Sequence, residues 1–261
     1  MRVPIPPHPR RRLGQNFLHD ENVLRKIIQF CEPTPNDTFV EIGAGTGALT
    51  ALLAPRIARL VAVEIDKSLL PYLQQVPAIE ILQTDIRDVD LCSIQNRKKV
   101  RVIGNLPYYI STTILTSLIA QKKCIEDMIL MFQEEVARRI TSPPSHPDYG
   151  MLSVLAQYFC LIEKGFRVSR NCFTPKPDVE SRVLRFRFRE NSKLDYAPFA
   201  DFLVKAFSQR RKKLRNNLLR SMSVTQERLN SVFTKFGIPE TARAENLSPE
   251  QFEQLILEFQ F

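Results

Sequence analysis

Residues 38–50, TFVEIGAGTGALT, decide the fold of this 261-residue chain. Thr38 to Ile42 form a short apolar run typical of a buried strand, and a glycine-rich turn and the start of a helix follow it directly. This order is the opening of a nucleotide-binding βαβ unit, because glycines let the backbone approach a ligand at the amino terminus of the helix. We therefore expect an α/β fold whose strands are largely parallel.

The glycine spacing fits two kinds of ligand. Gly43, Gly45 and Ala48 match the GxGxxG/A pattern of dinucleotide sites, whereas Glu41 with the following glycines matches the ExGxGxG pattern of S-adenosylmethionine sites. A carboxylate at residue 41 would repel a pyrophosphate but would attract the ammonium and sulfonium groups of S-adenosylmethionine. Charge complementarity therefore favours the methyl donor, with Glu41, Gly43 and Gly45 as candidate contacts.

Acids also follow the next two predicted strands. The second strand ends at Glu64, about twenty residues beyond the turn, where an acid typically binds ribose hydroxyls. The third is followed by Asp85, which is placed to accept a hydrogen bond from an adenine amino group. Each acid alone is more often a solvated carboxylate or a helix cap. Because open α/β sheets bind ligands at the carboxyl ends of their strands, we expect Gly43, Glu64, Asp85 and Asn105 to line one crevice.

The stretch VRVIGNLPYYISTT, residues 100–113, is the second informative segment. Asn105, Leu106, Pro107 and Tyr108 place an amide, a free carbonyl, a fixed φ and an aromatic ring at the carboxyl end of a strand. The amide and the Leu106 carbonyl can accept both hydrogens of an exocyclic amino group, and Tyr108 can stack on the base. This arrangement predicts a pocket for an extruded adenine, and a turn with a core tyrosine is the alternative.

Phe173 is a second aromatic candidate for the base-binding site. It opens the rigid loop FTPKP at residues 173–177 and could cover the other face of a stacked base. A phenylalanine is more often part of the core, and both interpretations stay open.

The remaining pattern predicts further strands and helices and a change of composition near Asn191. The run 183–188 alternates arginine with apolar residues, which predicts a half-buried last strand with a basic face. No strand-like run follows residue 191. We expect further strands at 128–132 and 166–168. We expect helices at 21–28, 111–120, 149–159, 199–218 and 248–259, and one that begins near Glu134. The chain should then have three parts: a basic arm at 1–12, a sheet domain at 13–190 and a helical domain at 191–261.

The charge indicates a polyanionic partner. The formal net charge is +9 and the pI is about 9.5. Between Lys205 and Arg220 the chain has seven basic residues and no acid, and such a one-sided run is more typical of phosphate binding than of a solvated face. The candidate RNA contacts of the arm and of this run are Arg10, Arg11, Arg12, Arg210, Arg211, Lys212, Lys213 and Arg215.

Metal and membrane chemistry are not indicated. The five cysteines contain no CxxC pair and the three histidines have no ligand-like spacing to them, which predicts reduced thiols in a cytosolic compartment and no metal site. No apolar run is long enough to span a bilayer, and the prolines among the first residues argue against a transit helix.

Six segments in order resemble the KsgA family of small-subunit rRNA adenine dimethyltransferases. They are LGQNFL at 13–18, EIGAGTGALT at 41–50, NLPYYIST at 105–112, FTPKPDVES at 173–181, RRKKLRNNL at 210–218 and RAENLSPEQF at 243–252. The match covers nearly the whole chain, and the ordered set is far more specific than any one segment. Ala44 stands where the family commonly has proline, and Lys213 where it often has threonine.

The resemblance implies a Rossmann-like, seven-stranded class I methyltransferase sheet with a smaller all-helical carboxyl-terminal domain. It implies S-adenosyl-L-methionine as donor, S-adenosyl-L-homocysteine as product, no metal, and two adjacent adenosines in the 3′-terminal hairpin loop of 16S rRNA as substrate. The expected protein is cytoplasmic and monomeric and acts on the 30S subunit or its precursor during small-subunit biogenesis. By motif position, Asn105 lies between donor and base, and the donor contacts are Asn16, Leu18, Gly43, Glu64 and Asp85.

Four alternatives stay open at the level of sequence. A 23S rRNA adenine methyltransferase of the antibiotic-resistance type would share the adenine pocket. A non-catalytic ribosome-assembly factor and a methyltransferase-fold transcription factor of mitochondria would not need the intact glycine turn and Asn105. A dinucleotide-dependent reductase fits the glycine turn alone.

Overall fold

The computed structural model describes residues 14–94 and 98–259. The chain divides into two compact units, one within Met1–Ala137 and Ile162–Phe188 and the other within Arg138–Leu161 and Arg189–Phe261. Residues 138–161 thus join the carboxyl-terminal helices, although they lie inside the predicted sheet domain. The predicted basic arm, with Arg10, Arg11 and Arg12, lies outside the described residues.

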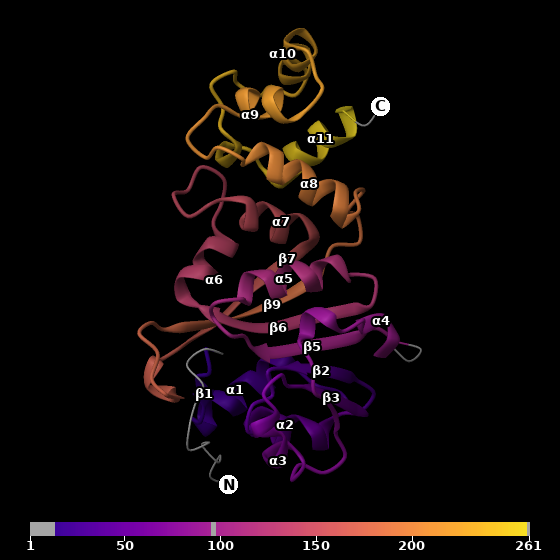
Figure 1. The fold of residues 1–261 in the computed structure, drawn as a ribbon, viewed down its shortest axis with the longest axis vertical. Helices are drawn as coiled ribbons and strands as arrows, with labels where there is room; N and C mark the ends of the chain where they lie inside the picture. The colour runs from indigo at the N-terminus through magenta and orange to yellow at the C-terminus, as the bar shows by residue number, and fades with distance from the viewer. Residues whose placement is uncertain (1–13, 95–97, 260–261) are drawn as a thin grey trace. The chain divides into compact units, whose positions relative to one another are not determined.

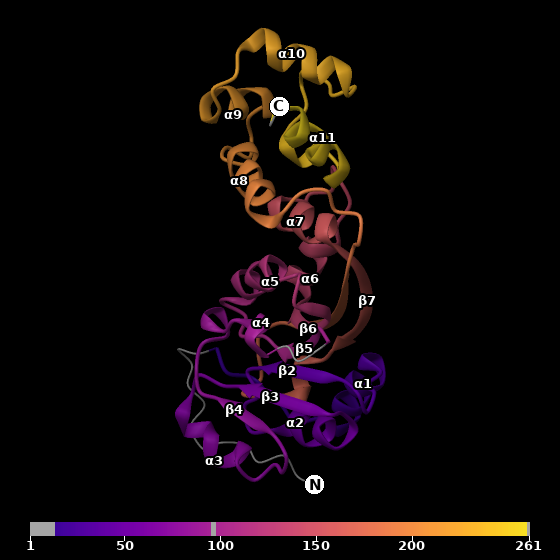
Figure 2. The ribbon, with the colours of Figure 1, turned by 90° about the vertical axis from the view of Figure 1, so that its right-hand side faces the viewer.

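A seven-stranded sheet forms the first unit, in the order β4-β3-β2-β5-β6-β9-β7 (Figures 1 and 2). The first five of these strands, from β4 to β6, are parallel to one another, and β9 pairs antiparallel with β6. The strands are β2 (Thr38–Ile42), β3 (Arg59–Val63), β4 (Glu80–Leu82), β5 (Val100–Asn105), β6 (Ile125–Gln133), β7 (Cys160–Val168) and β9 (Ser181–Phe188). This arrangement confirms the α/β fold with a parallel sheet.

The central strands are buried on both faces. In β5 every residue from Val100 to Gly104 is buried, and in β2 all but Thr38 are. Helices on both faces of a parallel sheet favour such largely apolar strands, in which Glu41 and Arg101 are the buried charged residues. Gly104 has a packing role here, because a Cβ at this position would lie 2.9 Å from the carbonyl oxygen of Ile42 on the neighbouring strand.

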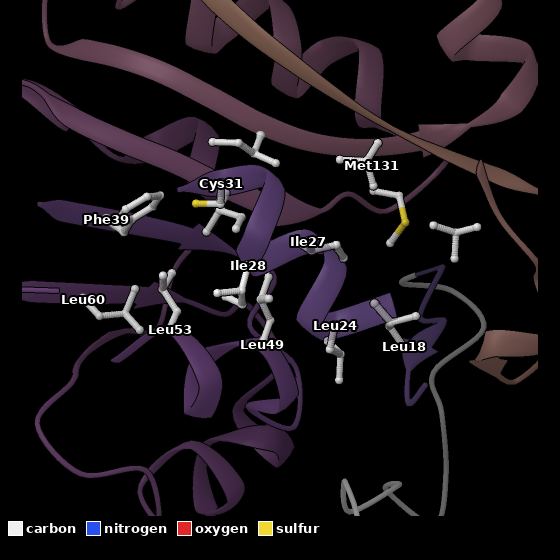
Figure 3. Packing of buried hydrophobic residues seen from close by; sticks show 14 of the residues in the cluster. Leu18, Leu24, Ile27, Ile28, Cys31, Phe39, Leu49, Leu53, Leu60 and Met131 are labelled. Atoms are coloured by element: carbon white, nitrogen blue, oxygen red, sulfur yellow. The ribbon is translucent and has the colours of Figure 1, made fainter. Parts of the chain in front are cut away.

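Asp20 caps the amino terminus of helix α1 (Glu21–Cys31), where its carboxylate accepts a hydrogen bond from the Val23 backbone amide. Its apolar face packs into the core cluster shown in Figure 3, where the burial of each large aliphatic side chain contributes about 2 kcal/mol. The members labelled there are Leu18, Leu24, Ile27, Ile28, Cys31, Phe39, Leu49, Leu53, Leu60 and Met131.

The other helices of the sheet unit are short, except for α5. Their bounds are α2 (Ala48–Leu53), α3 (Leu70–Leu73), α4 (Leu91–Ile94) and α5 (Ser111–Ala120), with 3-10 turns η2 (Ala54–Arg56), η3 (Lys67–Leu69), η4 (Ile86–Asp88) and η5 (Arg170–Cys172). A separate two-stranded sheet pairs β1 (Phe17–Leu18) with β8 (Phe173–Thr174). The sequence pattern did not predict this pair, since two residues are too few to show a period.

Arg185, one of the two arginines on the predicted basic face of 183–188, is buried in an ion network. Asp127 on β6 accepts from Arg101 of β5 at 2.7 Å and from Arg185 of β9 at 2.9 Å, and all three side chains are less than 10% exposed. Arg101 also pairs with Asp37, and Arg185 also pairs with Glu32. Arg185 is therefore a structural cation of the sheet, because its position on β9 brings it beside two acids.

The second unit consists of helices packed around aromatic side chains. Tyr158 stacks on Phe199 with ring centroids 3.9 Å apart, and Phe202 contacts Phe252 edge to face. The helices are α7 (Met151–Phe159), α8 (Tyr196–Ala206), α9 (Leu214–Ser221), α10 (Gln226–Lys235) and α11 (Pro249–Phe259), with η6 (Ala244–Asn246), while α6 (Glu134–Thr141) contributes to both units.

One helical prediction needs correction, and one helix was missed. The stripe at 199–218 is two helices, α8 and α9, separated by the polar segment 207–213, and α10 was missed because its apolar residues are few. The capping box of α11 is present, since Gln251 and Ser248 exchange backbone and side-chain hydrogen bonds.

The prediction that every cysteine is a free thiol is wrong for one pair. Cys92 of α4 and Cys124, the residue before β6, form a disulfide with Cα atoms 5.1 Å apart. Their separation of 32 residues gives no local motif, and only the fold brings them together. Cys31, Cys160 and Cys172 remain thiols. Among residues 14–94 and 98–259, no helix is long and apolar enough to cross a membrane.

Candidate active site

A pocket lies in the sheet unit where the parallel strands end. Gly43 follows β2, Glu64 follows β3, Asp85 lies beyond β4, and Asn105 is the last residue of β5. The structure thus places the turn at Gly43 and the side chains of Glu64, Asp85 and Asn105 around one cavity. The predicted site residues that line it are Asn16, Leu18, Glu41, Gly43, Gly45, Glu64, Asp85, Asn105, Leu106, Pro107 and Tyr108.

The glycine turn is built on left-handed backbone. Gly43, Gly45 and Gly47 have φ values of 66°, 61° and 82°, which favour glycine strongly. The Gly43 amide donates to the Val63 carbonyl at 2.9 Å, which ties the turn to β3. The turn is therefore a rigid wall of the pocket that leads directly into α2.

Glu64 supports the turn and still has acceptor capacity. One carboxylate oxygen accepts from the Gly45 amide at 2.9 Å and the other from the Asp66 amide at 2.8 Å. Burial raises the pKa of Glu64, and these backbone donors oppose the shift. Because each carboxylate oxygen has two lone pairs, Glu64 can accept two further hydrogen bonds from a ligand.

Glu41 is the most deeply buried acid of the pocket wall. It is 3% exposed, and burial raises its pKa to about 8, an effect that the nearby Thr50 hydroxyl opposes and the charge of Glu64 increases. Within the described part of the chain its Oε2 has no hydrogen-bond partner. A buried acceptor without a donor is costly, so a cationic ligand beside it would be stabilised.

Asp85 is an ionised cap at the third strand end. Its carboxylate accepts from the backbone amide of Arg87 at 2.9 Å and from the Arg87 guanidinium at 2.6 and 3.0 Å. The side-chain hydrogen bond from Arg87 lowers the pKa of Asp85, while partial burial opposes it. Asp85 therefore presents a fixed carboxylate as an acceptor at the pocket.

Asn105 has a fixed orientation. Its Nδ2 donates to the backbone carbonyl of Asn16 at 2.9 Å, and the Asn16 side chain donates in turn to the Gly14 carbonyl at 3.1 Å. This leaves Oδ1 of Asn105 as the free acceptor of the amide. In the described part of the chain, the Leu106 carbonyl also accepts no hydrogen bond. Two neighbouring acceptors are thus available at the end of β5.

Tyr108 is a half-buried, neutral phenol whose ring is locked. Its hydroxyl shares a hydrogen bond of 2.7 Å with the fully buried Ser181 hydroxyl, and burial raises the pKa of Tyr108. The Ser111 hydroxyl donates to the Tyr108 carbonyl. Hydrogen bonds at the hydroxyl and at the backbone carbonyl of Tyr108 therefore fix its aromatic ring at the pocket, where the sequence predicts it.

Phe173 does not line the pocket. It is 2% exposed, pairs with Leu18 between β8 and β1, and belongs to the hydrophobic core cluster. Its neighbour Leu18 lines the pocket in its place. The structure thus favours the core interpretation of Phe173 over the stacking one, because the ring is buried in the core cluster and is absent from the pocket lining.

Thr84, which precedes Asp85 at the third strand end, lines the pocket as expected, whereas Ile65 and Tyr109 line it although the sequence pattern did not single them out. Ile65 and Tyr109 stand next to predicted site residues, namely Glu64 and Tyr108. That adjacency is the signal that could have found them, because the residues that follow a strand end share its loop.

The predicted RNA contacts of the second unit differ in their partners. Arg210 pairs with Glu245 and donates to the Pro147 carbonyl, and Arg215 pairs with Glu240 at 2.8 Å. Arg211, Lys212 and Lys213 are exposed and form no ion pair with any described residue. The last three cations are thus the ones available to an anionic ligand.

Across residues 14–94 and 98–259, no group of three or more histidine, cysteine or acidic side chains could hold a metal ion. Three features identify the class of fold: the strand order, the glycine turn after β2 and the pocket at the carboxyl ends of β2 to β5. Together they define the sheet unit as a class I methyltransferase fold.

The family follows from comparison with known proteins. The model of the ribosomal RNA adenine dimethylase family matches residues 8–260, and the chain belongs to this family. The predicted resemblance is thereby confirmed. The chain is 45% identical over 228 residues to the ribosomal RNA small subunit methyltransferase A of Coxiella burnetii, covering 83% of this chain and 87% of the relative. The corresponding protein of Salinibacter ruber is 40% identical and covers 98% and 86%.

Two solved structures share the fold across nearly the whole chain. A dimethyladenosine transferase from Plasmodium falciparum superposes with a TM-score of 0.80 at 24% identity, covering 94% of this chain and 97% of that one. The 23S rRNA methyltransferase ErmE has a TM-score of 0.68 at 26% identity and covers 94% and 100%. The first shows the fold, and the second is a more distant relative in sequence than the small-subunit methyltransferases.

Proposed function

We propose that this protein transfers methyl groups from S-adenosyl-L-methionine to N6 of two adjacent adenosines in the 3′-terminal hairpin loop of 16S rRNA, two methyl groups to each. Membership of the adenine dimethylase family supports the reaction, and the curated relatives named as small-subunit methyltransferases support the substrate. The observation that carries the proposal is the pair of free acceptors at the end of β5, the Asn105 amide oxygen and the Leu106 carbonyl.

The pocket fits the donor by charge and by hydrogen bonding. The unpartnered Oε2 of Glu41 suits a cationic amino acid moiety, Glu64 has two lone pairs for ribose hydroxyls, and Asp85 is an ionised acceptor for an adenine amino group. Asn16, Leu18, Gly43 and Gly45 complete the wall. S-adenosylmethionine would supply an electrophilic methyl group here and yield S-adenosylhomocysteine.

The acceptor side of the pocket prepares a weak nucleophile. The lone pair of an adenine amino nitrogen is delocalised into the ring, so the nitrogen reacts only when this conjugation is reduced. In the first transfer, hydrogen bonds from the two amino hydrogens to Asn105 Oδ1 and the Leu106 carbonyl favour a pyramidal nitrogen with its lone pair directed at the donor. In the second transfer the one remaining N–H keeps one of these hydrogen bonds, and each added methyl group is balanced by the loss of one proton from N6 to solvent. Tyr108 stacks on the extruded base, and Pro107 fixes the backbone between these groups.

The division of labour places donor and adenine binding in the predicted sheet domain, although its residues 138–161 belong to the helical unit. Residues 13–190 bind the donor and the adenine, and residues 191–261 contribute cations for the rRNA backbone, chiefly Arg211, Lys212 and Lys213. The protein acts as a monomer in the cytoplasm on the 30S subunit or its precursor. Its reaction marks a step of small-subunit biogenesis.

A 23S rRNA methyltransferase of the antibiotic-resistance type is the nearest competing function, since ErmE shares the fold. Sequence identity favours the small subunit, with 40–45% to its methyltransferases against 26% to ErmE. Transfer of labelled methyl groups to 30S particles that lack the modification, with 23S rRNA as the control, separates the two. We expect label in 30S particles alone, and label in 23S rRNA alone would replace the proposal by its competitor.

A further inference from the structure

Tyr109 is an exposed aromatic ring at the rim of the adenine pocket. It is 60% exposed, the largest fraction among the exposed large hydrophobic side chains of the described chain, and it lines the same pocket as Asn105 and Tyr108. An exposed ring of this size leaves apolar surface in water, and such surface beside a ligand site marks a contact with the ligand.

The ring is held in place although it is exposed. A Cβ on Gly14 would lie 3.0 Å from Cδ1 and 3.4 Å from Cε1 of Tyr109, so the ring packs directly on the Gly14 backbone, whose φ is 60°. The Gly14 carbonyl accepts from Asn16, and the Asn16 carbonyl accepts from Asn105. Tyr109 is thus connected through two hydrogen bonds to the amide that is proposed to bind the target base.

The two consecutive tyrosines have different environments. The Tyr108 hydroxyl is bound to Ser181 and its ring is half-buried, as a fixed wall of the pocket requires. The Tyr109 hydroxyl makes no hydrogen bond with any described residue, and most of its ring faces solvent. The second ring therefore contacts the pocket and also has a solvent-exposed surface at the pocket rim.

We propose that Tyr109 stacks on the nucleobase adjacent to the adenosine that occupies the pocket. This inference rests on the proposed function, because extrusion of one base from an RNA loop removes a stacking partner from its neighbour. An aromatic side chain at the rim replaces that partner, and stacking of one base contributes about 1–3 kcal/mol. With two adjacent adenosines as substrate, the base on Tyr109 is the second adenosine while the first is methylated.

Steady-state kinetics on 30S particles that lack the modification test the role of the ring. Tyr109→Leu keeps apolar volume but removes the aromatic face, and we expect it to raise KM for the particle about tenfold. The KM for S-adenosylmethionine and kcat stay unchanged. Tyr109→Phe retains the ring and restores the KM to within about twofold of wild type. Tyr72→Leu, at a half-buried tyrosine of α3 outside the pocket, is the matched control and leaves all three constants unchanged.

A direct measurement on the wild-type protein covers the case in which Tyr109→Leu does not fold. A hairpin RNA with 2-aminopurine next to the target adenosine reports stacking by fluorescence quenching. We expect the probe to stay quenched when the wild type or Tyr109→Phe binds, because the ring replaces the stacking partner that extrusion removes. Fluorescence that rises on binding to the level of an unstacked 2-aminopurine overturns the inference.

The outcomes distinguish this inference from the function on which it rests. If wild type transfers no methyl group to the particles, the proposed function fails first. If wild type is active and Tyr109→Leu has an unchanged KM for the particle, only the role of Tyr109 fails. If Tyr109→Leu instead weakens donor binding, the ring belongs to the donor site and the inference is wrong.

Discussion

Asn105 combines two roles that depend on opposite ends of one amide group. Its Nδ2 holds the Asn16 carbonyl, which positions the segment that leads into β1, and its Oδ1 is left for the substrate. A side chain fixed on one side and free on the other needs no rearrangement when the substrate arrives, which is the basis of preorganised catalysis.

We expect Asn105→Ala to reduce methyl transfer about a hundredfold, because it removes one of the two acceptors of the amino hydrogens. The dissociation constant for S-adenosylmethionine should change little, since Glu41, Glu64 and Asp85 are intact. Single-turnover transfer and isothermal titration measure the two effects separately. Near-normal turnover in this variant would remove Asn105 from the mechanism.

Glu41 predicts a dependence of stability on pH. Its pKa is about 8 in the folded protein against an ordinary value of 4.5, so in this window the folded chain retains a proton that the unfolded chain has lost. Stability therefore falls as pH rises from 4.5 to about 8, by at most about 1.4 kcal/mol per pH unit from this group.

Substitution of Glu41→Gln should remove this contribution. Urea unfolding of the ligand-free proteins across the window should show the variant gaining stability over wild type as the pH rises. Donor binding provides a second readout, because a cationic ligand favours the ionised carboxylate, so affinity should rise with pH in wild type and stay flat in the variant. Parallel pH profiles of stability for the two proteins would contradict the assignment.

At the scale of elements, the buried ion network links three adjacent strands, β5, β6 and β9. Asp127 on the middle strand is 3% exposed and holds Arg101 and Arg185 at once. Removal of the central charge leaves two buried guanidinium groups without their shared partner, which is much more costly than the loss of a surface pair.

We expect Asp127→Asn to lower the free energy of unfolding by about 3 kcal/mol. The matched control is Glu163→Gln, which breaks the pair with Arg187 on the same strand β9 as Arg185, where both side chains are about half exposed. This control should cost less than about 1 kcal/mol. Urea unfolding of both variants measures the difference, and equal effects would show that the network is not a stabilising element.

The same elements show how far the sequence predicts the structure. Glycine turns, strand-end acids and caps depend on residues close in the chain, so β2, the Asp20 cap and the α11 capping box were predictable. The pocket lining followed from one rule about strand ends, which needs only the strand order. The β1–β8 pair, the Cys92–Cys124 disulfide and the buried Arg185 depend on contacts between distant segments, and no local period contains them.

At the scale of the whole molecule, the net charge of +9 is informative only after paired and free cations are separated. Arg210 and Arg215 have acidic partners, whereas Arg211, Lys212 and Lys213 have none in the described chain. The sequence alone does not distinguish the paired cations from the unpaired ones among these five residues. A polyanion releases counterions on binding only to the extent that unpaired cations replace them.

We therefore expect the triple change of Arg211, Lys212 and Lys213 to glutamine to lower the slope of log affinity against log salt by about 2 for an rRNA fragment. Arg215→Gln, whose partner is Glu240, is the control and should change the slope by less than about 0.5. Filter binding over a range of salt concentrations gives both slopes. A larger effect of the control than of the triple variant would place the contact on α9 instead of on the segment before it.

The central claim is that strand-end groups on one sheet hold a methyl donor against an extruded adenine of the small subunit. Mass-spectrometric mapping of rRNA, taken from modification-deficient 30S particles after incubation with the protein and S-adenosylmethionine, tests it most directly. The account predicts N6,N6-dimethyladenosine at two adjacent nucleotides of the 3′-terminal hairpin loop of 16S rRNA. Methyl groups on another atom of adenine, on another base or at a different site in the rRNA would contradict it.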